Sequence, residues 1–162
     1  MKCMNHEAVI DSIMEQYEKA CMDMNVVYGP YSVGKTYIAK ELQNRLTSNH
    51  VVYLLGRLAN ESVHIRSIER GLDMPSGSFC TLEEALRRVF QMSVDKHMMF
   101  IIDDYPALVD TAPQVPILLR ELMETYRDYG KMFVLLMGTH VDELKGRILG
   151  ESSLIAPYIH SH

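Results

Sequence analysis

The clearest chemical signal in the chain is an eight-residue loop from Gly29 to Thr36. It has the sequence Gly-Pro-Tyr-Ser-Val-Gly-Lys-Thr and fits the pattern G-x-x-x-x-G-K-[ST] at every required position. The two glycines let the backbone turn so that successive N–H groups face inward, and the helix that follows adds the positive end of its dipole. The pattern therefore predicts a loop that binds phosphate groups.

The side chains at the end of this loop have separate expected roles. Lys35 adds a mobile positive charge for the terminal phosphates of a nucleotide, and the Thr36 hydroxyl can ligate Mg²⁺. Of the residues between the glycines, Tyr31, Ser32 and Val33 need to supply only their backbone. We expect the nucleotide to lie against Gly29, Pro30, Tyr31, Ser32, Val33, Gly34, Lys35, Thr36 and Tyr37.

Two further strand ends carry polar residues. Asp103 and Asp104 follow the apolar run 98–102, and Thr139 follows the apolar run 132–137 and a glycine. Asp103 is the expected second ligand of Mg²⁺, because a hard cation prefers oxygen ligands. Asp104 either deprotonates the water that attacks the γ-phosphate or caps the next turn. Thr139 either bonds the phosphate or the water, or caps the helix that follows.

Alternating strand and helix patterns place these residues on an α/β fold. Short β-branched or unbroken apolar runs predict strands at residues 24–28, 51–55, 98–102 and 132–137. Apolar residues at spacings of three and four predict helices at residues 5–21, 36–46 and 59–72. A further helix is predicted from residue 81 onward, where a Thr-x-x-Glu capping box begins it. The last predicted helix covers about 116–129 and ends at Gly130, which is expected in a left-handed conformation. Such alternation indicates a mainly parallel sheet whose ligand lies at the carboxyl ends of the strands.

Composition limits the classes of function. A chain of 162 residues has the size of one domain, and it contains no apolar run long enough to span a membrane, so we expect a cytoplasmic protein. A net charge of −5 gives no electrostatic reason for direct nucleic-acid binding. Three widely spaced cysteines indicate reduced thiols, and the terminal His-Ser-His is expected to be a disordered tail.

Several ordered motifs resemble those of a known family. The segments are "VVYGPYSVGKT", "SFCTLEEAL", "FIIDDYPAL" and "VLLMGTHVDELKGRILGESSL". Over almost the whole chain the sequence is similar to the prokaryotic ATPases of the archaeal-ATPase group, within the AAA+ and STAND part of the P-loop superfamily. The resemblance implies a three-layer sandwich in which the strand of the phosphate loop lies beside the fourth strand, with the third next to that. Lys35, Thr36, Asp103 and Thr139 would then meet around ATP and Mg²⁺.

The sequence departs from the family pattern at several places. Tyr31 stands where the family usually has arginine, and Asp104 stands where it has the glutamate that activates water. The family's late segment with an arginine corresponds to "SSLIAPYIHSH", which contains none. We also expect the fifth strand and the C-terminal domains of the family to be lacking, as in an excised ATPase core, a truncated gene product or a degenerate member.

These residues predict an ATP-binding domain that hydrolyses Mg-ATP slowly to drive or switch a protein partner, a missing domain or a second copy. The first alternative is a nucleotide-binding switch or scaffold that barely hydrolyses, because an aspartate at position 104 is one methylene shorter than glutamate. A second is a GTPase in which Asp142 holds the base, although Thr139-His140-Val141-Asp142 has histidine where the guanine-reading motif has lysine. A small-molecule kinase is a third, without a visible arginine-rich lid.

Overall fold

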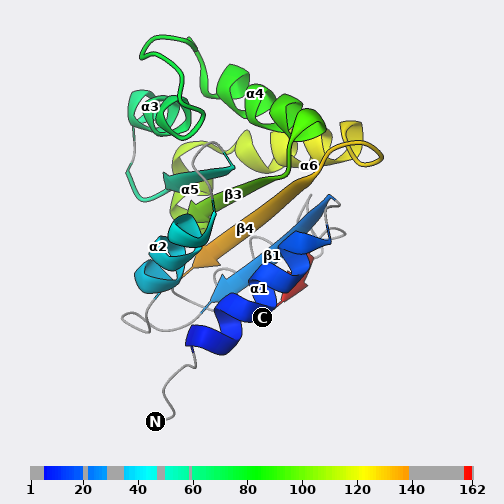
Figure 1. The fold of residues 1–162 in the computed structure, drawn as a ribbon. Helices are drawn as coiled ribbons and strands as arrows, with labels where there is room; N and C mark the ends of the chain where they lie inside the picture. Colours follow the sequence, from blue (N-terminus) through cyan, green and yellow to red (C-terminus); the bar gives the residue numbers. More distant parts are fainter. Residues whose placement is uncertain are drawn as a thin grey trace.

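The computed structural model describes residues 6–19, 22–28, 35–46, 50–58, 60–138 and 159–161. Its centre is a parallel sheet of five strands in the order β2-β3-β4-β1-β5 (Figure 1). The strands are β1 (Asp23–Tyr28), β2 (Val51–Leu55), β3 (Met98–Asp103), β4 (Met132–Gly138) and β5 (Ile159–Ser161). The helices are α1 (His6–Glu18), α2 (Lys35–Arg45), α3 (Glu61–Gly71), α4 (Leu82–Asp95), α5 (Tyr105–Thr111) and α6 (Val115–Thr125). The phosphate-loop strand lies beside β4 and β3 follows, as the resemblance implied.

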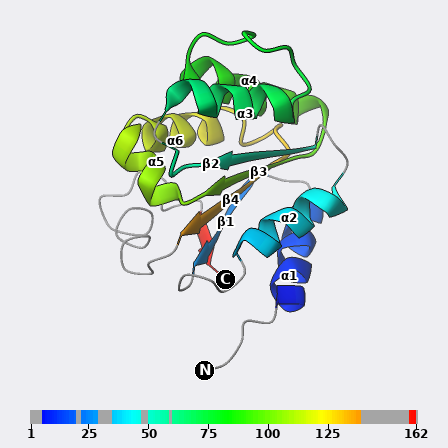
Figure 2. The ribbon, with the colours of Figure 1, turned by 90° about the vertical axis from the view of Figure 1, so that its left-hand side faces the viewer.

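Helices cover both faces of the sheet, which makes the fold a three-layer sandwich. Figure 2 shows α1 and α2 on one face and α3, α4, α5 and α6 on the other. All residues of β3 and β4 are buried, because successive side chains of a strand point to opposite faces and each face has its own core. Met99 and Ile101 belong to the core under α1 and α2, whereas Phe100 and Ile102 belong to the core under the other helices.

The strand register aligns the carboxyl ends of the central strands. Tyr28 of β1 pairs with Gly138 of β4, and Leu55 of β2 pairs with Asp103 of β3. Ile102 of β3 pairs with Leu136 of β4, so the last residues of β1, β4 and β3 end at the same edge of the sheet. The three polar strand ends predicted from the sequence therefore belong to one edge.

The prediction that the fifth strand is lacking is wrong. β5 pairs in parallel with β1, with Ile159 opposite Met24 and Ser161 opposite Val26. The last residues of the chain, expected to be a disordered tail, thus include an ordered strand. A strand of three residues is too short to show an alternating pattern, and what stabilises it is backbone hydrogen bonding to the open edge of β1.

Some helix ends also differ from the prediction. The helix α5 was not predicted from the sequence, and α6 ends at Thr125 instead of near residue 129. Gly130 is absent from the residues with positive φ among those described, so the left-handed end predicted there is wrong. A glycine is required at position 130 because there is no room for a side chain: an added Cβ would lie 2.9 Å from the carbonyl oxygen of Tyr126. The capping box is confirmed at the threonine, since Thr81 Oγ1 accepts a hydrogen bond from the Glu84 N–H at 3.1 Å.

Two expectations from composition can be compared with the described residues. Within those ranges no helix has both the length and the apolar character needed to cross a membrane. Cys80 is a free thiol, in agreement with the prediction of reduced cysteines, and it is exposed, while Cys3 and Cys21 lie outside the described residues.

Candidate nucleotide-binding site

The predicted phosphate loop connects β1 to α2. β1 ends at Tyr28 and α2 begins at Lys35, so the strand, loop and helix follow one another as the motif requires. Residues 29–34 lie outside the described residues, and so do Thr139 and Asp142. For Lys35 and Thr36 the structure describes the helical backbone alone. The structure therefore shows that α2 begins directly after the loop. The contacts of the Lys35 and Thr36 side chains stay a prediction.

Asp103, the predicted metal ligand, is the last residue of β3. Its side chain shares the sheet face of Met99 and Ile101, which is the face that α2 covers. Only 8% of the residue is exposed. A buried carboxylate is costly unless it is paired, hydrogen-bonded or bound to a metal, and its hard oxygen atoms suit Mg²⁺. The donor chemistry of Asp103 thus fits the ion that its motif predicts.

The side chain of Asp103 has one partner that the sequence analysis missed. The Tyr53 hydroxyl of β2 donates a hydrogen bond to Asp103 Oδ2 at 2.7 Å. Burial, and then the hydrogen bond and charge of Asp103, raise the pKa of the Tyr53 hydroxyl far above its ordinary value, with a small opposing effect of Arg57. Tyr53 therefore stays protonated as a donor across the physiological range.

The backbone of Asp103 is held by Gly56, just after β2. The Gly56 N–H donates to the Asp103 carbonyl oxygen at 2.7 Å. A Cβ added at Gly56 would lie 2.6 Å from the carbonyl oxygen of Asp104 and 2.8 Å from Leu108 Cβ. No ordinary side chain fits there, so a glycine is what allows the segment after β2 to pack against the two aspartates.

Asp104, the candidate base, occupies an unusual backbone conformation. Its φ of 53° and ψ of 54° are left-handed, which is uncommon for any residue but glycine and best tolerated by Asn and Asp. It stands at the N-cap position of α5, yet its carboxylate makes no capping hydrogen bond to that helix. The capping alternative for Asp104 is therefore wrong. Strained residues of this kind cluster at functional sites, and the half-buried Asp104 is consistent with one.

A signal for Tyr53 and Gly56 existed in the sequence but needed the strand pairing to be interpreted. In a parallel pair with Leu55 opposite Asp103, Tyr53 stands two residues earlier on the same face and can reach diagonally. Gly56 is the first residue after that strand. Without knowing that β2 neighbours β3, neither residue could be connected to the aspartates.

Taken together, the sheet order, the helix that starts behind the loop strand and the acidic end of β3 define a P-loop ATPase domain of the AAA+ type. The model of the AAA family, described as the ATPase family associated with various cellular activities, matches residues 25–156. This chain belongs to that family. Nucleotide binding is the property that the family shares, so ATP is the ligand expected at the site.

Individual relatives agree with this assignment. The chain is 23% identical over 150 residues to the uncharacterized protein MJECL04 of Methanocaldococcus jannaschii, covering 92% of this chain and 32% of that protein. Cdc6p from Pyrobaculum aerophilum has a similar fold, with a TM-score of 0.65 and 15% identity over 99% of this chain and 45% of its own. The Walker-type ATPase PABY2304 of Pyrococcus abyssi matches with a TM-score of 0.67 and 12% identity, over 94% of this chain and 52% of its own.

The chain spans about a third of the curated relative and about half of these two solved structures. At such low identity the structural likeness shows the fold alone. The activities and partners of the longer proteins therefore enter only as proposals.

Proposed function

We propose that this chain, as a single domain, binds Mg-ATP at Gly29–Thr36, hydrolyses it slowly and uses the nucleotide state to drive or switch a partner, a further domain or a second copy. The observation that carries the proposal is the position of Asp103. Its buried carboxylate ends β3 on the sheet face covered by α2, the helix that starts with Lys35 and Thr36. The predicted phosphate loop and the predicted metal ligand thus belong to strands that end at the same edge of the sheet, which supports the proposal.

Each residue would have a distinct task. The backbone N–H groups of residues 29–34, among which Pro30 has none, and the ammonium of Lys35 bind the phosphates and offset their charge. The Thr36 hydroxyl and the Asp103 carboxylate hold Mg²⁺, which when bound neutralises charge on the phosphate oxygens. Asp104 orients and deprotonates the attacking water, and Thr139 bonds the phosphate or that water.

A second candidate function is a nucleotide-dependent switch that barely hydrolyses ATP. Asp104 favours it, because its carboxylate reaches one methylene less far than that of a glutamate, and a misplacement of about 1 Å can cost about a hundredfold in rate. Binding and hydrolysis therefore need separate assays. Single-turnover release of phosphate from bound ATP distinguishes the slow ATPase from the switch.

The binding test is calorimetric titration of the purified chain with ATP and with GTP, each with Mg²⁺ and with EDTA. We expect ATP to bind more tightly than GTP, and more tightly with Mg²⁺ than without. Preference for GTP would move the proposal to a GTPase and to Asp142 as the residue that holds the base.

Lys35→Ala is the matching variant. Removing the ammonium takes away the charge that faces the terminal phosphates, so ATP binding should be lost while the circular dichroism spectrum and melting temperature stay near those of the wild type. Unchanged ATP affinity in this variant would overturn the assignment of the phosphate loop.

A further inference from the structure

We propose that Tyr53 is a positioning residue for Asp103: its hydroxyl fixes one carboxylate oxygen so that the other is directed at Mg²⁺ or at a water bound to it. The inference rests on the proposed function, because it assigns Asp103 to the metal of bound ATP. Tyr53 belongs to β2, a strand that contains neither the residues of the phosphate loop nor the two aspartates.

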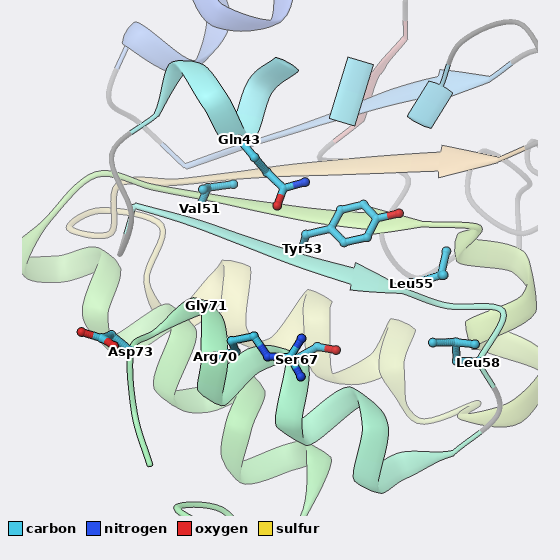
Figure 3. Close-up of a pocket in the computed structure, with 9 residues that line it drawn as sticks. All are labelled: Gln43, Val51, Tyr53, Leu55, Leu58, Ser67, Arg70, Gly71 and Asp73. Atoms are coloured by element: carbon cyan, nitrogen blue, oxygen red, sulfur yellow. The ribbon is translucent and has the colours of Figure 1, made fainter. Parts of the chain in front are cut away.

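The geometry of the two strands makes the contact specific. Tyr53 is paired with Ile101, and its side chain shares the α2-covered face with Asp103, two residues further along β3. Figure 3 shows the Tyr53 ring extended along β2 with its hydroxyl directed towards the carboxyl end of the strand. The bond to Asp103 Oδ2 is 2.7 Å long, a length typical of a hydroxyl that donates to a charged oxygen.

The hydrogen bond gives the two oxygen atoms of the Asp103 carboxylate different roles. Because Oδ2 accepts the tyrosine hydroxyl, the hydrogen bond restrains rotation of the carboxylate, and Oδ1 would be the oxygen that binds the metal or its water. The backbone of the same aspartate is fixed by the Gly56 N–H at 2.7 Å. Tyr53 of β2 and Gly56 just after it therefore hold the side chain and the main chain of the predicted ligand, as partners behind a metal ligand commonly do.

The surroundings of Tyr53 allow its hydroxyl to be removed by mutation while the packing of the ring is kept. The ring forms part of the wall of a groove of about 600 Å³ along β2, with Gln43 of α2 on one side and Ser67 and Arg70 of α3 on the other (Figure 3). Since Tyr53 is only half-buried, replacing it with phenylalanine removes the hydrogen bond without opening a cavity in the core. The variant Tyr53→Phe is thus a test of orientation rather than of packing.

The experiment measures how the ATP affinity of the full chain depends on Mg²⁺, for the wild type and for Tyr53→Phe. Partners behind a ligand typically contribute about 10- to 100-fold in metal affinity, so the variant should need about 10 to 100 times more Mg²⁺ for half-maximal tightening of ATP binding. Its ATP affinity in EDTA should equal that of the wild type. An unchanged Mg²⁺ requirement, or an equal loss of affinity in EDTA, would overturn the inference.

A double-mutant cycle with Asp103→Asn shows whether Tyr53 acts through the aspartate. An asparagine offers the metal no charged oxygen, so the effect of Tyr53→Phe on the Mg²⁺ requirement should disappear in the Asp103→Asn background. An effect of the same size in both backgrounds would mean that Tyr53 acts elsewhere, and would contradict the proposal.

Tyr17→Phe is the matched control. The Tyr17 hydroxyl of α1 also donates a hydrogen bond, to the carbonyl oxygen of His97 at 3.2 Å, but His97 precedes the amino-terminal end of β3. Losing that bond should leave the Mg²⁺ requirement unchanged. If the wild type itself binds ATP without any effect of Mg²⁺, or does not bind ATP, both the proposed function and this inference are overturned. Magnesium-dependent binding that both tyrosine variants retain equally overturns the inference alone.

Discussion

Replacing Gly56 with alanine should displace the two aspartates at the end of β3. The new Cβ would lie 2.6 Å from the Asp104 carbonyl oxygen, 2.9 Å from that of Asp103 and 2.8 Å from Leu108 Cβ. None of these atoms is the flexible end of a side chain. The methyl group can be accommodated only if the segment after β2 moves away from the aspartates, or if the aspartates move.

The size of the effect follows from the contact distances. Ordinary contact begins near 3.4 Å, so the Asp104 carbonyl and the methyl must separate by about 0.8 Å. Overpacking of this kind typically costs about 1–3 kcal/mol of stability. Since a misplacement of about 1 Å can cost about a hundredfold in rate, we expect phosphate release to fall by about 10- to 100-fold. ATP affinity in EDTA should stay the same, because the phosphate loop is not touched.

The assay is single-turnover phosphate release from Mg-ATP, with thermal unfolding measured on the same samples. Gly77→Ala is the control, because Gly77 has a φ of 90° and no atom of the described residues lies within 4 Å of an added Cβ. That variant should lose about 1 kcal/mol from the left-handed backbone and keep its rate. A folded Gly56→Ala protein with the wild-type rate would refute the reasoning that this glycine sets the position of the acidic pair.

Two other substitutions test neighbouring residues. Asp104→Glu should raise the rate of hydrolysis, because the longer side chain brings the carboxylate nearer to the water, while the melting temperature falls since glutamate tolerates the φ of 53° less well; an equal or lower single-turnover rate would contradict this explanation. Tyr105→Phe should raise the free energy of unfolding by about 1 kcal/mol in urea titrations, because the fully buried Tyr105 hydroxyl finds no hydrogen-bond partner among the described residues. Burial also raises the pKa of that hydroxyl. A less stable Tyr105→Phe variant would reveal a partner for it.

Much of the fold could be predicted because long apolar runs encode buried parallel strands directly. The runs at 51–55, 98–102 and 132–137 match β2, β3 and β4 to within one residue at each end. The sequence could not reveal β5, since three residues carry no periodicity and form a strand only through the edge of β1. It could not reveal α5 either, a seven-residue helix directly after Asp104 that is too short to show a repeating apolar face.

The candidate site, too, could be predicted from the sequence only in part. Motif spacing predicts which residues carry the chemistry, because G-x-x-x-x-G-K-[ST] and the aspartates after an apolar strand are local patterns. It does not predict what holds them. Tyr53 and Gly56 act across a strand pair, so their roles depend on which strands are neighbours and in what register. Contacts of this kind depend on tertiary structure, so a signal along the chain can be interpreted only once the strand pairing is known.

The backbone at Asp104 explains how two successive aspartates can have different tasks. In a continuing strand, Asp104 would point to the face opposite Asp103, into the apolar core under α3, α4, α5 and α6. The left-handed turn at φ 53° ends that alternation, and the fully buried Tyr105 contributes to this core instead. Asp104 stays half-buried at the sheet edge, while Asp103 keeps the strand geometry that lets Tyr53 hold it. The left-handed backbone at Asp104 thus ends the strand geometry directly after Asp103, so that the two successive carboxylates can take the different roles proposed for them.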